Sequence, residues 1–348
     1  MPRRKVGQAP AREGRVTRRR PWLLGALLLV ASCALLALGA AIGSTGIDSL
    51  RAVRQDPVAW QIVWDIRLPR TAGAWVCGAL LGLAGAVAQG LFRNPLAEPY
   101  LLGSASGASL GTALALLVAG QSPAAAMAGD WLIQLGVTGA AFVGAVIAVL
   151  LTLALARGAQ HTLRLLLGGV IVGVVLGAAK DLVTLAAPRI LEAMQGFTLG
   201  STAFLGWQAV ALMAAVLLGC LIVSLLLAPV LDGLALGEAT ATSLGLALPT
   251  LRAALVAVLA LCTATAVAHA GLIAFVGLAA PHLVRPLVRS THAALLILSA
   301  GMGGLLLMAS DLLARGLFAP LELPVGVLTA LLGGGYLLWL MHRRGARR

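Results

Sequence analysis

Two pairs of charged residues stand out in a chain in which only 11% of residues are charged. Arg67 and Arg70 flank a Leu-Pro dipeptide directly before a long apolar run, and Asp311 and Arg315 lie four residues apart near the end of another. A guanidinium binds a carboxylate through paired hydrogen bonds, so the chemistry indicated here is ion-pair recognition of acidic groups. The i,i+4 spacing also allows Asp311 and Arg315 to pair with each other on one helix face.

Each of these arginines therefore has two interpretations. Arg67 and Arg70 either extend from an apolar helix into the membrane interface, as long basic side chains do, or receive acidic side chains of a soluble partner. Arg315 is either the ion-pair partner of Asp311 or a second external docking charge.

The sequence lacks the motifs that several kinds of chemistry require. There is no G-x-x-x-x-G-K-[ST] phosphate loop, no nucleophile with a base and an orienting group, and no ligand spacing among the histidines. The four cysteines are isolated within apolar runs, where thiols act as small hydrophobic groups. We therefore expect no enzyme activity, no metal site and no cofactor, and any ATP hydrolysis must occur on another subunit.

The elements that position these residues are expected to be membrane-spanning helices. Hydrophobic residues make up 60% of the chain, and many apolar runs reach the roughly 20 residues that a spanning helix needs. The predicted fold is all-α, a polytopic membrane protein with about ten transmembrane helices. The expected spans are 22–43, 70–91, 101–119, 131–156, 162–187, 204–227, 250–269, 271–288, 293–314 and 324–342. Pro281 makes the eighth of these short or bent.

The distribution of charge predicts the orientation of the bundle. Eight of the 25 basic residues lie within residues 1–20, and four more close the chain. Basic clusters beside apolar spans mark the cytoplasmic side, so the net charge of +13 does not indicate nucleic-acid binding. We expect a basic cytoplasmic tail at 1–21, one transmembrane permease domain at 22–342 and a second basic cytoplasmic tail at 343–348.

Glycines recur at four-residue spacing within the expected spans. Small residues at this spacing allow helix backbones to approach closely in lipid, so a compact, glycine-rich bundle is predicted. The expected packing positions are Gly103, Gly107 and Gly111 in the third span and Gly169, Gly173 and Gly177 in the fifth, with Gly78 and Gly82 as one further pair.

The long polar connection at 231–247 is predicted to carry a short amphipathic helix at about 236–244. Such a helix either lies on the membrane surface or is gripped by a partner protein. It lacks the Lys/Arg face typical of membrane-surface helices, which favours the protein partner.

Lys180 and Asp181 bring charge into the fifth span, and charges inside a membrane are functional candidates. They lie toward the outer end of this span, near the membrane interface, and adjacent residues do not share a helix face. We retain them as candidates for the lining of a cavity.

Five segments together resemble FecCD-type permeases, the membrane subunits of type II ABC importers for ferric siderophores, haem and vitamin B12. The resemblance covers about residues 60 to 342. The segments are Arg67-Leu-Pro-Arg70, Arg93-Asn-Pro-Leu-Ala-Glu-Pro99, Leu236-Gly-Glu-Ala-Thr-Ala-Thr-Ser-Leu-Gly245, Phe275-Val-Gly-Leu-Ala-Ala-Pro-His282 and Glu322-Leu-Pro-Val-Gly326.

The resemblance implies a bacterial inner-membrane location and a set of partners: two ATP-binding cassette ATPase subunits, a periplasmic substrate-binding protein and a second permease subunit, with a homodimer preferred. Arg67 and Arg315 resemble the arginines that meet acidic residues of the binding protein. The helix within the 231–247 connection resembles the coupling helix seated in the ATPase. Its expected residues are Leu236, Gly237, Glu238, Ala239, Ser243, Leu244 and Gly245.

Two other classes of function compete with this one. A stand-alone secondary transporter would be driven by an ion gradient without an ATPase, but no chain of acidic residues deep in the spans is evident. A membrane enzyme would need catalytic polar residues at one depth, and none is found. The resemblance leaves the cargo open among a ferric siderophore, haem and cobalamin.

Overall fold

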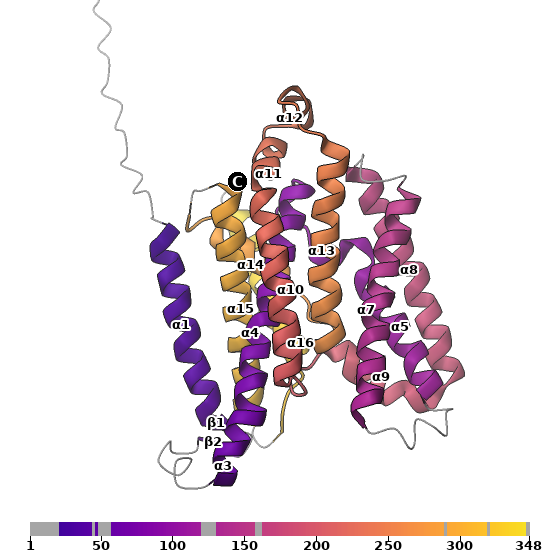
Figure 1. Cartoon of the computed structure of the whole chain (residues 1–348), viewed down its shortest axis with the longest axis vertical. Helices are drawn as coiled ribbons and strands as arrows, with labels where there is room; N and C mark the ends of the chain where they lie inside the picture. Colours follow the sequence, from indigo (N-terminus) through magenta and orange to yellow (C-terminus); the bar gives the residue numbers. More distant parts are fainter. Residues whose placement is uncertain are drawn as a thin grey trace, which may run out of the picture.

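The structure, a computed structural model, describes residues 21–43, 46–47, 57–119, 130–156, 162–288, 291–318 and 321–345. Helices dominate these residues and lie side by side along a common direction (Figure 1). Helix α1 begins, and the chain ends, at the end of the bundle that carries α12, whereas α3 and α9 lie at the opposite end. We call these the α12 end and the α3 end.

The elements are α1 Pro21–Ala41, β1 Ile42–Gly43, β2 Gly46–Ile47, α3 Pro57–Ile62, η1 Val63–Arg67, α4 Leu68–Leu91, η2 Pro99–Leu102, α5 Ser104–Ala119, α7 Asp130–Leu155, α8 Thr162–Ala186, η3 Pro188–Ile190, α9 Leu191–Leu199, α10 Trp207–Leu226, α11 Ala228–Ala235, α12 Glu238–Ser243, α13 Leu248–Ala270, α14 Val276–Val284, α15 His292–Gly316 and α16 Val325–Gly345. The strands β1 and β2 form an antiparallel pair of two residues each.

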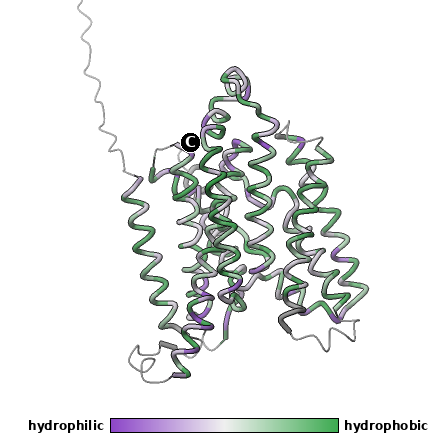
Figure 2. The backbone as a smooth tube through the Cα atoms, in the orientation of Figure 1, coloured by the Kyte–Doolittle hydropathy of each residue, from purple (hydrophilic) through white to green (hydrophobic). Residues whose placement is uncertain are grey.

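The prediction of an all-α, polytopic membrane protein is confirmed. Each of the ten expected spans contains a helix, and seven of the helices are long and apolar enough to cross a membrane. Two shorter apolar helices, Ser104–Ala119 and Val325–Trp339, accompany them. Figure 2 shows hydrophobic residues along the lengths of the helices and polar residues mainly near the ends.

The start of the second span differs from the prediction. Instead of beginning at Arg70, the helix runs without interruption through Pro57–Leu91. Pro69 has no N–H and its ring displaces the preceding turn, and the chain accommodates it by a π-helical turn at Val63–Arg67, in which the Leu68 N–H bonds to the carbonyl oxygen five residues back. The two arginines therefore sit inside a long helix rather than at its first residue.

The eighth expected span is short, as Pro281 predicted. Helix α14 has nine residues, and residues 271–275 before it are not helical. Irregular backbone within a membrane protein needs partners inside the protein. The Leu272 N–H donates to the Phe197 carbonyl oxygen at 3.0 Å, and the Phe275 N–H donates to Glu98 Oε1 at 3.3 Å.

Helix α4 lies at the centre of the bundle and is almost wholly buried among α10, α13, α14 and α15. Its closest neighbour is α15. A Cβ atom at Gly78 would overlap the Gly303 carbonyl oxygen, and one at Gly82 would overlap that of Ser299. Two backbones in such contact form one rigid unit, since no side chain separates them.

The expected packing glycines lie at helix contacts of different tightness. Gly107 and Gly111 abut α7, where a Cβ atom would overlap the carbonyl oxygens of Gly144 and Ala140. Gly169 abuts Leu101 in the same manner. The contacts at Gly173 and Gly177 are looser, and Gly103 has a different role. A Cβ at Gly173 or Gly177 would lie 3.7 or 3.9 Å from Ser106 Oγ, and Gly103 ends η2 at a φ of +82°.

We predict that Gly107→Ala destabilises the protein, because the added methyl group must push α5 away from α7. Overpacking of this kind costs about 1–3 kcal/mol. Gly139→Ala on α7 is the matched control, since a Cβ there meets nothing within 4 Å. The measurement is the temperature at which each purified variant loses its monodisperse peak in size-exclusion chromatography. Equal loss in both variants would contradict the packing role of Gly107.

Candidate functional site

A cluster of six side chains, which we call the Asp311 cluster, joins four segments at the α3 end. Asp311 receives hydrogen bonds from Arg70 Nε at 3.1 Å and from Thr202 Oγ1 at 2.6 Å, and it also pairs with Arg315. The members are Arg70 and Thr71 of α4, Thr202 between α9 and α10, Asp311 and Arg315 of α15, and Glu322 before α16. The cluster therefore ties both central helices to the segments that precede α10 and α16.

The charges in this cluster balance. Asp311 is fully buried and Arg315 is 2% exposed. Arg70 Nη1 reaches the partly exposed carboxylate of Glu322 at 2.8 Å, so two arginines face two carboxylates. A buried charge is tolerated when it is both paired and hydrogen-bonded, and removing one partner is then strongly destabilising. The cluster is thus a fixed structural joint.

The two expected docking arginines occupy different environments. Arg67 is partly buried at the α3 end, where its Nη1 donates to the carbonyl oxygens of Ala40 and Ala41 at 3.5 Å each. Arg315 lies inside the protein and forms an ion pair with Asp311, which is one of the two interpretations that the sequence leaves open. A single hydroxyl links the two arginines, because Thr71 Oγ1 donates to the Arg67 carbonyl oxygen at 2.8 Å and accepts from Arg315 at 2.9 Å.

Sequence reasoning did not find the contacts of Arg70 and Thr202 with Asp311. Arg70 is 241 residues from Asp311 along the chain, and Thr202 is 109 residues from it. Only the i,i+4 spacing of Asp311 and Arg315 gave a signal, because it lies within one helix.

A second group of charged side chains, which we call the Glu238 cluster, lies at the α12 end. Glu238 Oε1 is 2.6 Å from Arg252 Nη2 on α13 and 3.8 Å from Arg93 Nη2, just after α4. The neighbouring helix α11 makes its own contact: Asp232 Oδ1 lies 2.6 Å from His292 Nδ1 and accepts the His292 N–H at 3.1 Å. Together α11 and α12 are fastened to three helices of the bundle.

The tip formed by α12 is short and carries polar side chains between two exposed leucines. The predicted helix at about 236–244 is observed at Glu238–Ser243, between Gly237 and Gly245 at φ values of +111° and +79°. Positive φ suits glycine and ends the helix sharply on both sides. Leu236 and Leu244 flank it and are 69% and 64% exposed.

Lys180 and Asp181, the candidates for a cavity lining, lie on α8. They form an ion pair with each other on α8. Flexibility of the long lysine side chain permits this contact although the two residues are adjacent. Asp181 is largely exposed, so the pair lies at a surface of α8 and not within the helix bundle.

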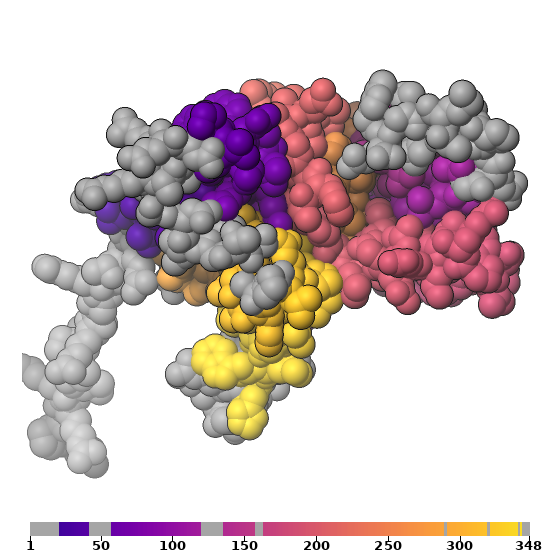
Figure 3. Space-filling view, turned by 90° about the horizontal axis from the view of Figure 1, so that it is seen from below, coloured from indigo at the N-terminus to yellow at the C-terminus, as the bar shows by residue number. Residues whose placement is uncertain are grey.

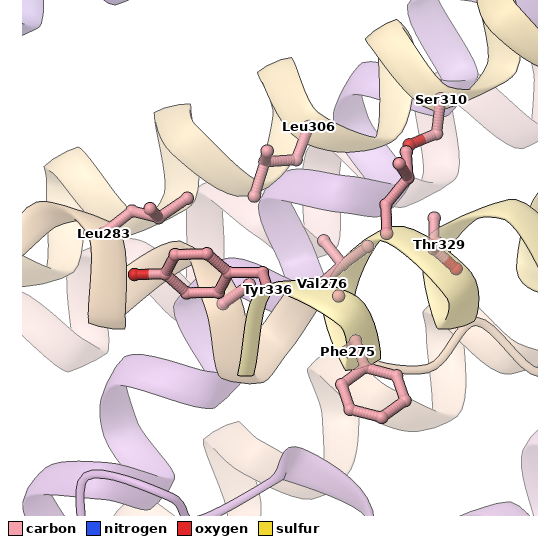
Figure 4. A pocket seen from close by; sticks show the side chains of 10 residues that line it. Phe275, Val276, Leu283, Leu306, Ser310, Thr329 and Tyr336 are labelled. Atoms are coloured by element: carbon pink, nitrogen blue, oxygen red, sulfur yellow. The ribbon is translucent and has the colours of Figure 1, made fainter. Parts of the chain in front are cut away.

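The cavity in Figure 4 has a volume of about 220 Å³ and lies between α14, α15 and α16. Its walls are mostly apolar, with hydroxyl groups from Ser310, Thr329 and Tyr336. Across the ranges that the structure describes, no group of three or more His, Cys, Asp or Glu residues could hold a metal ion. The cavity therefore offers space without acid–base or metal chemistry.

A bundle of membrane-spanning helices whose buried charged residues serve as structural joints fits a membrane transport protein. Comparison with known proteins agrees with this class. The profile of the FecCD transport family matches residues 27–343, and the chain belongs to that family. Its resemblance to FecCD-type permeases is thereby confirmed.

Curated relatives cover nearly the whole chain. The hemin transport system permease protein HmuU of Yersinia pestis is 36% identical over 331 residues, which are 94% of this chain and 97% of the relative. The vitamin B12 import system permease protein BtuC of Salmonella schwarzengrund is 38% identical over 322 residues, 92% and 94% of the two chains. Both relatives are named as permease proteins of a transport or import system.

Solved structures share the fold. A structure described as an inward-facing conformation of a proposed metal-chelate type ABC transporter has a TM-score of 0.82 and 28% identity, and covers 93% of this chain and all of that one. A chain of PsaBC from Streptococcus pneumoniae in complex with Fab has a TM-score of 0.56 at 15% identity over 83% of this chain and 92% of that one, which shows likeness of fold alone.

We predict that Asp311→Asn strongly destabilises the protein, because it leaves Arg70 and Arg315 without their shared carboxylate charge. Breaking a buried ion pair costs about 3–5 kcal/mol. Asp181→Asn is the control, since an exposed ion pair contributes only about 0–1 kcal/mol. Thermal unfolding of the purified variants measures both changes. A small effect of Asp311→Asn, comparable with that of Asp181→Asn, would show that the Asp311 cluster is not a stabilising joint.

Proposed function

We propose that this chain is the permease subunit of an ABC importer that moves an iron chelate, either haem or a ferric siderophore, or cobalamin from the periplasm to the cytoplasm. The chain forms the passage, and ATP is hydrolysed on a separate subunit. The match to the FecCD family over nearly the whole chain carries this proposal. The relatives named for hemin and vitamin B12 support the cargo class, and their near-equal identity does not select one cargo.

The tip around α12 is the proposed seat for the ATPase. It comprises the predicted coupling residues Leu236, Gly237, Glu238, Ala239, Ser243, Leu244 and Gly245. Its exposed leucines give it an apolar surface, which suits a pocket of a soluble partner. Gly237 and Gly245 adopt positive φ values and so allow the chain to turn sharply on both sides of α12. Because the tip is compact, it can transmit a movement of the ATPase to the helix bundle.

The α12 end would then face the cytoplasm. Helix α1 begins and α16 ends there, which is the arrangement that the basic tails favour. Of the predicted tails, 1–21 and 343–348, residues 1–20 and 346–348 lie outside the described residues, whereas Pro21 begins α1 and residues 343–345 end α16. Arg93, Arg252 and Arg285 add positive charge at this end, and both termini are proposed to be cytoplasmic.

The α3 end would then receive the substrate-binding protein. Arg67 is the proposed direct contact, because it is partly exposed there. Arg315 is buried in this structure, so we assign it an indirect part in docking. Through Thr71 it holds the turn of α4 that carries Arg67.

A second copy of this chain is proposed to complete the passage. Large parts of α8 and α16 are exposed and apolar, and α16 projects from the rest of the bundle when it is seen from the α3 end (Figure 3). Residues of this kind face either lipid or another permease subunit. A stand-alone secondary transporter is not favoured, since the relatives are subunits of ABC importers.

The ATPase seat predicts the effect of Leu236→Asp together with Leu244→Asp. Charges placed on an apolar contact surface must be desolvated on binding, so the double variant should lose co-purification of the ATPase subunit. Thr240→Ala, an exposed residue of the same tip, is the control. The measurement is quantitative mass spectrometry of the complex purified from its native membrane in mild detergent. Retention of the ATPase by the double variant would refute this seat.

Docking at the α3 end predicts that Arg67→Glu weakens capture of the binding protein about tenfold, mainly through slower association and with a smaller dependence on salt. Arg189→Glu is the matched control, because Arg189 is an exposed arginine in η3, directly before α9, which lies at the same end. The measurement is biolayer interferometry with the permease in nanodiscs at several salt concentrations. Equal losses for both variants would indicate general electrostatic attraction instead of a specific contact.

A further inference from the structure

Helix α12 makes few contacts through which its movement could displace the rest of the protein. It packs against α11, where Ala241 is fully buried, and its outer face is exposed. Its one acidic side chain, Glu238, turns toward the bundle instead of toward the tip, because its carboxylate contacts Arg252 and approaches Arg93. This side chain is therefore the direct polar connection between the tip and two spanning helices.

The contact with Arg252 is the stronger of the two. The donor and acceptor atoms are 2.6 Å apart, and Arg252 is 3% exposed. Charge-assisted hydrogen bonds are short and strong, and burial of Arg252 reduces screening on one side of the pair, although the Glu238 side chain is 42% exposed. Arg93, at 3.8 Å and half exposed, adds a weaker attraction. A displacement of Glu238 is therefore transmitted first to Arg252, near the beginning of α13.

Helix α13 runs from its first turns, which contain Arg252, to the irregular segment at 271–275. The far end of α13 is held by the Ser201 N–H, which donates to the Ala270 carbonyl oxygen at 2.8 Å. Phe275 ends the segment and packs against α16, where a Cβ atom at Gly333 would overlap its side chain. One helix therefore joins the tip to the cavity-lining Phe275 shown in Figure 4.

We propose that Glu238 is a positioning residue that couples α12 to α13 through Arg252, so that movement of the tip on the ATPase shifts α13 and the segment 271–275. This inference rests on the proposed function, since it needs an ATPase at the tip. It assigns Arg252 and Arg93 a part in energy coupling. The competing route runs through α11, whose Asp232 contacts His292 at the start of α15.

The test is hydrogen–deuterium exchange of the full complex of permease and ATPase, with and without ATP and vanadate. Wild type should show protection at 236–245 from the ATPase and a nucleotide-dependent change in α13 and 271–275. Glu238→Gln keeps the size and one acceptor oxygen but removes the charge. It should keep the protection of the tip and reduce the response of α13 and 271–275 about tenfold, the equilibrium effect of one charged hydrogen bond.

Control variants separate this route from its competitor. Thr242→Ala alters an exposed hydroxyl of α12 that bonds only to the Glu238 carbonyl oxygen, and it should leave the response unchanged. Exchanging the two charges, Glu238→Arg with Arg252→Glu, should restore part of the response. If Glu238→Gln does not assemble, Glu238→Asp takes its place, since it shortens the same side chain without removing its charge, and it should weaken the response.

The outcomes distinguish two failures. An unchanged response of α13 in the Glu238 variants, or a loss only in Asp232→Asn, would overturn the coupling role of Glu238 while leaving the ATPase seat intact. Wild type that binds the ATPase at the tip without any response of α13 would overturn it too. Absence of protection at 236–245 in wild type would remove the proposed ATPase seat and this inference with it.

Discussion

The rest of this structure depends on the contact between α4 and α15. Lipid gives helices no hydrophobic reason to associate, so their packing must come from close van der Waals contact and polar bonds. Gly78 and Gly303 allow the two backbones to touch, and Asp311 binds Arg70 across the same pair of helices at the α3 end. Because α4 is buried on all sides, the remaining helices pack around this rigid pair.

The two charged clusters have different physical characters. The Asp311 cluster is almost fully buried and charge-balanced, so its strength is that of a fixed joint. The Glu238 cluster is partly exposed and holds a small, separate tip, so it can follow the movement of a partner. A transporter needs both kinds of contact: a rigid unit that moves as a whole, and an attachment point through which movement is applied.

The tightness of helix packing also differs between parts of the bundle. Helix α5 meets α7 through glycines that admit no Cβ, whereas α16 stands apart enough from α14 and α15 to leave a cavity. The cavity walls are apolar and carry only hydroxyl groups.

The sequence alone determined the all-α membrane class, the ten helical segments and the family, because apolar length and local motifs are properties of neighbouring residues. It offered the pairing of Asp311 with Arg315 as one of two interpretations, because the i,i+4 spacing lies within one helix. It also placed the short helix at the tip. Tertiary structure decided that Arg315 is buried, that Arg70 and Thr202 share Asp311, and that Glu238 faces Arg252. Residues more than 100 positions apart meet only when helices pack, and burial depends on that packing. The π-helical turn before Pro69 likewise followed from a helix that continues past the proline, which local propensity disfavours.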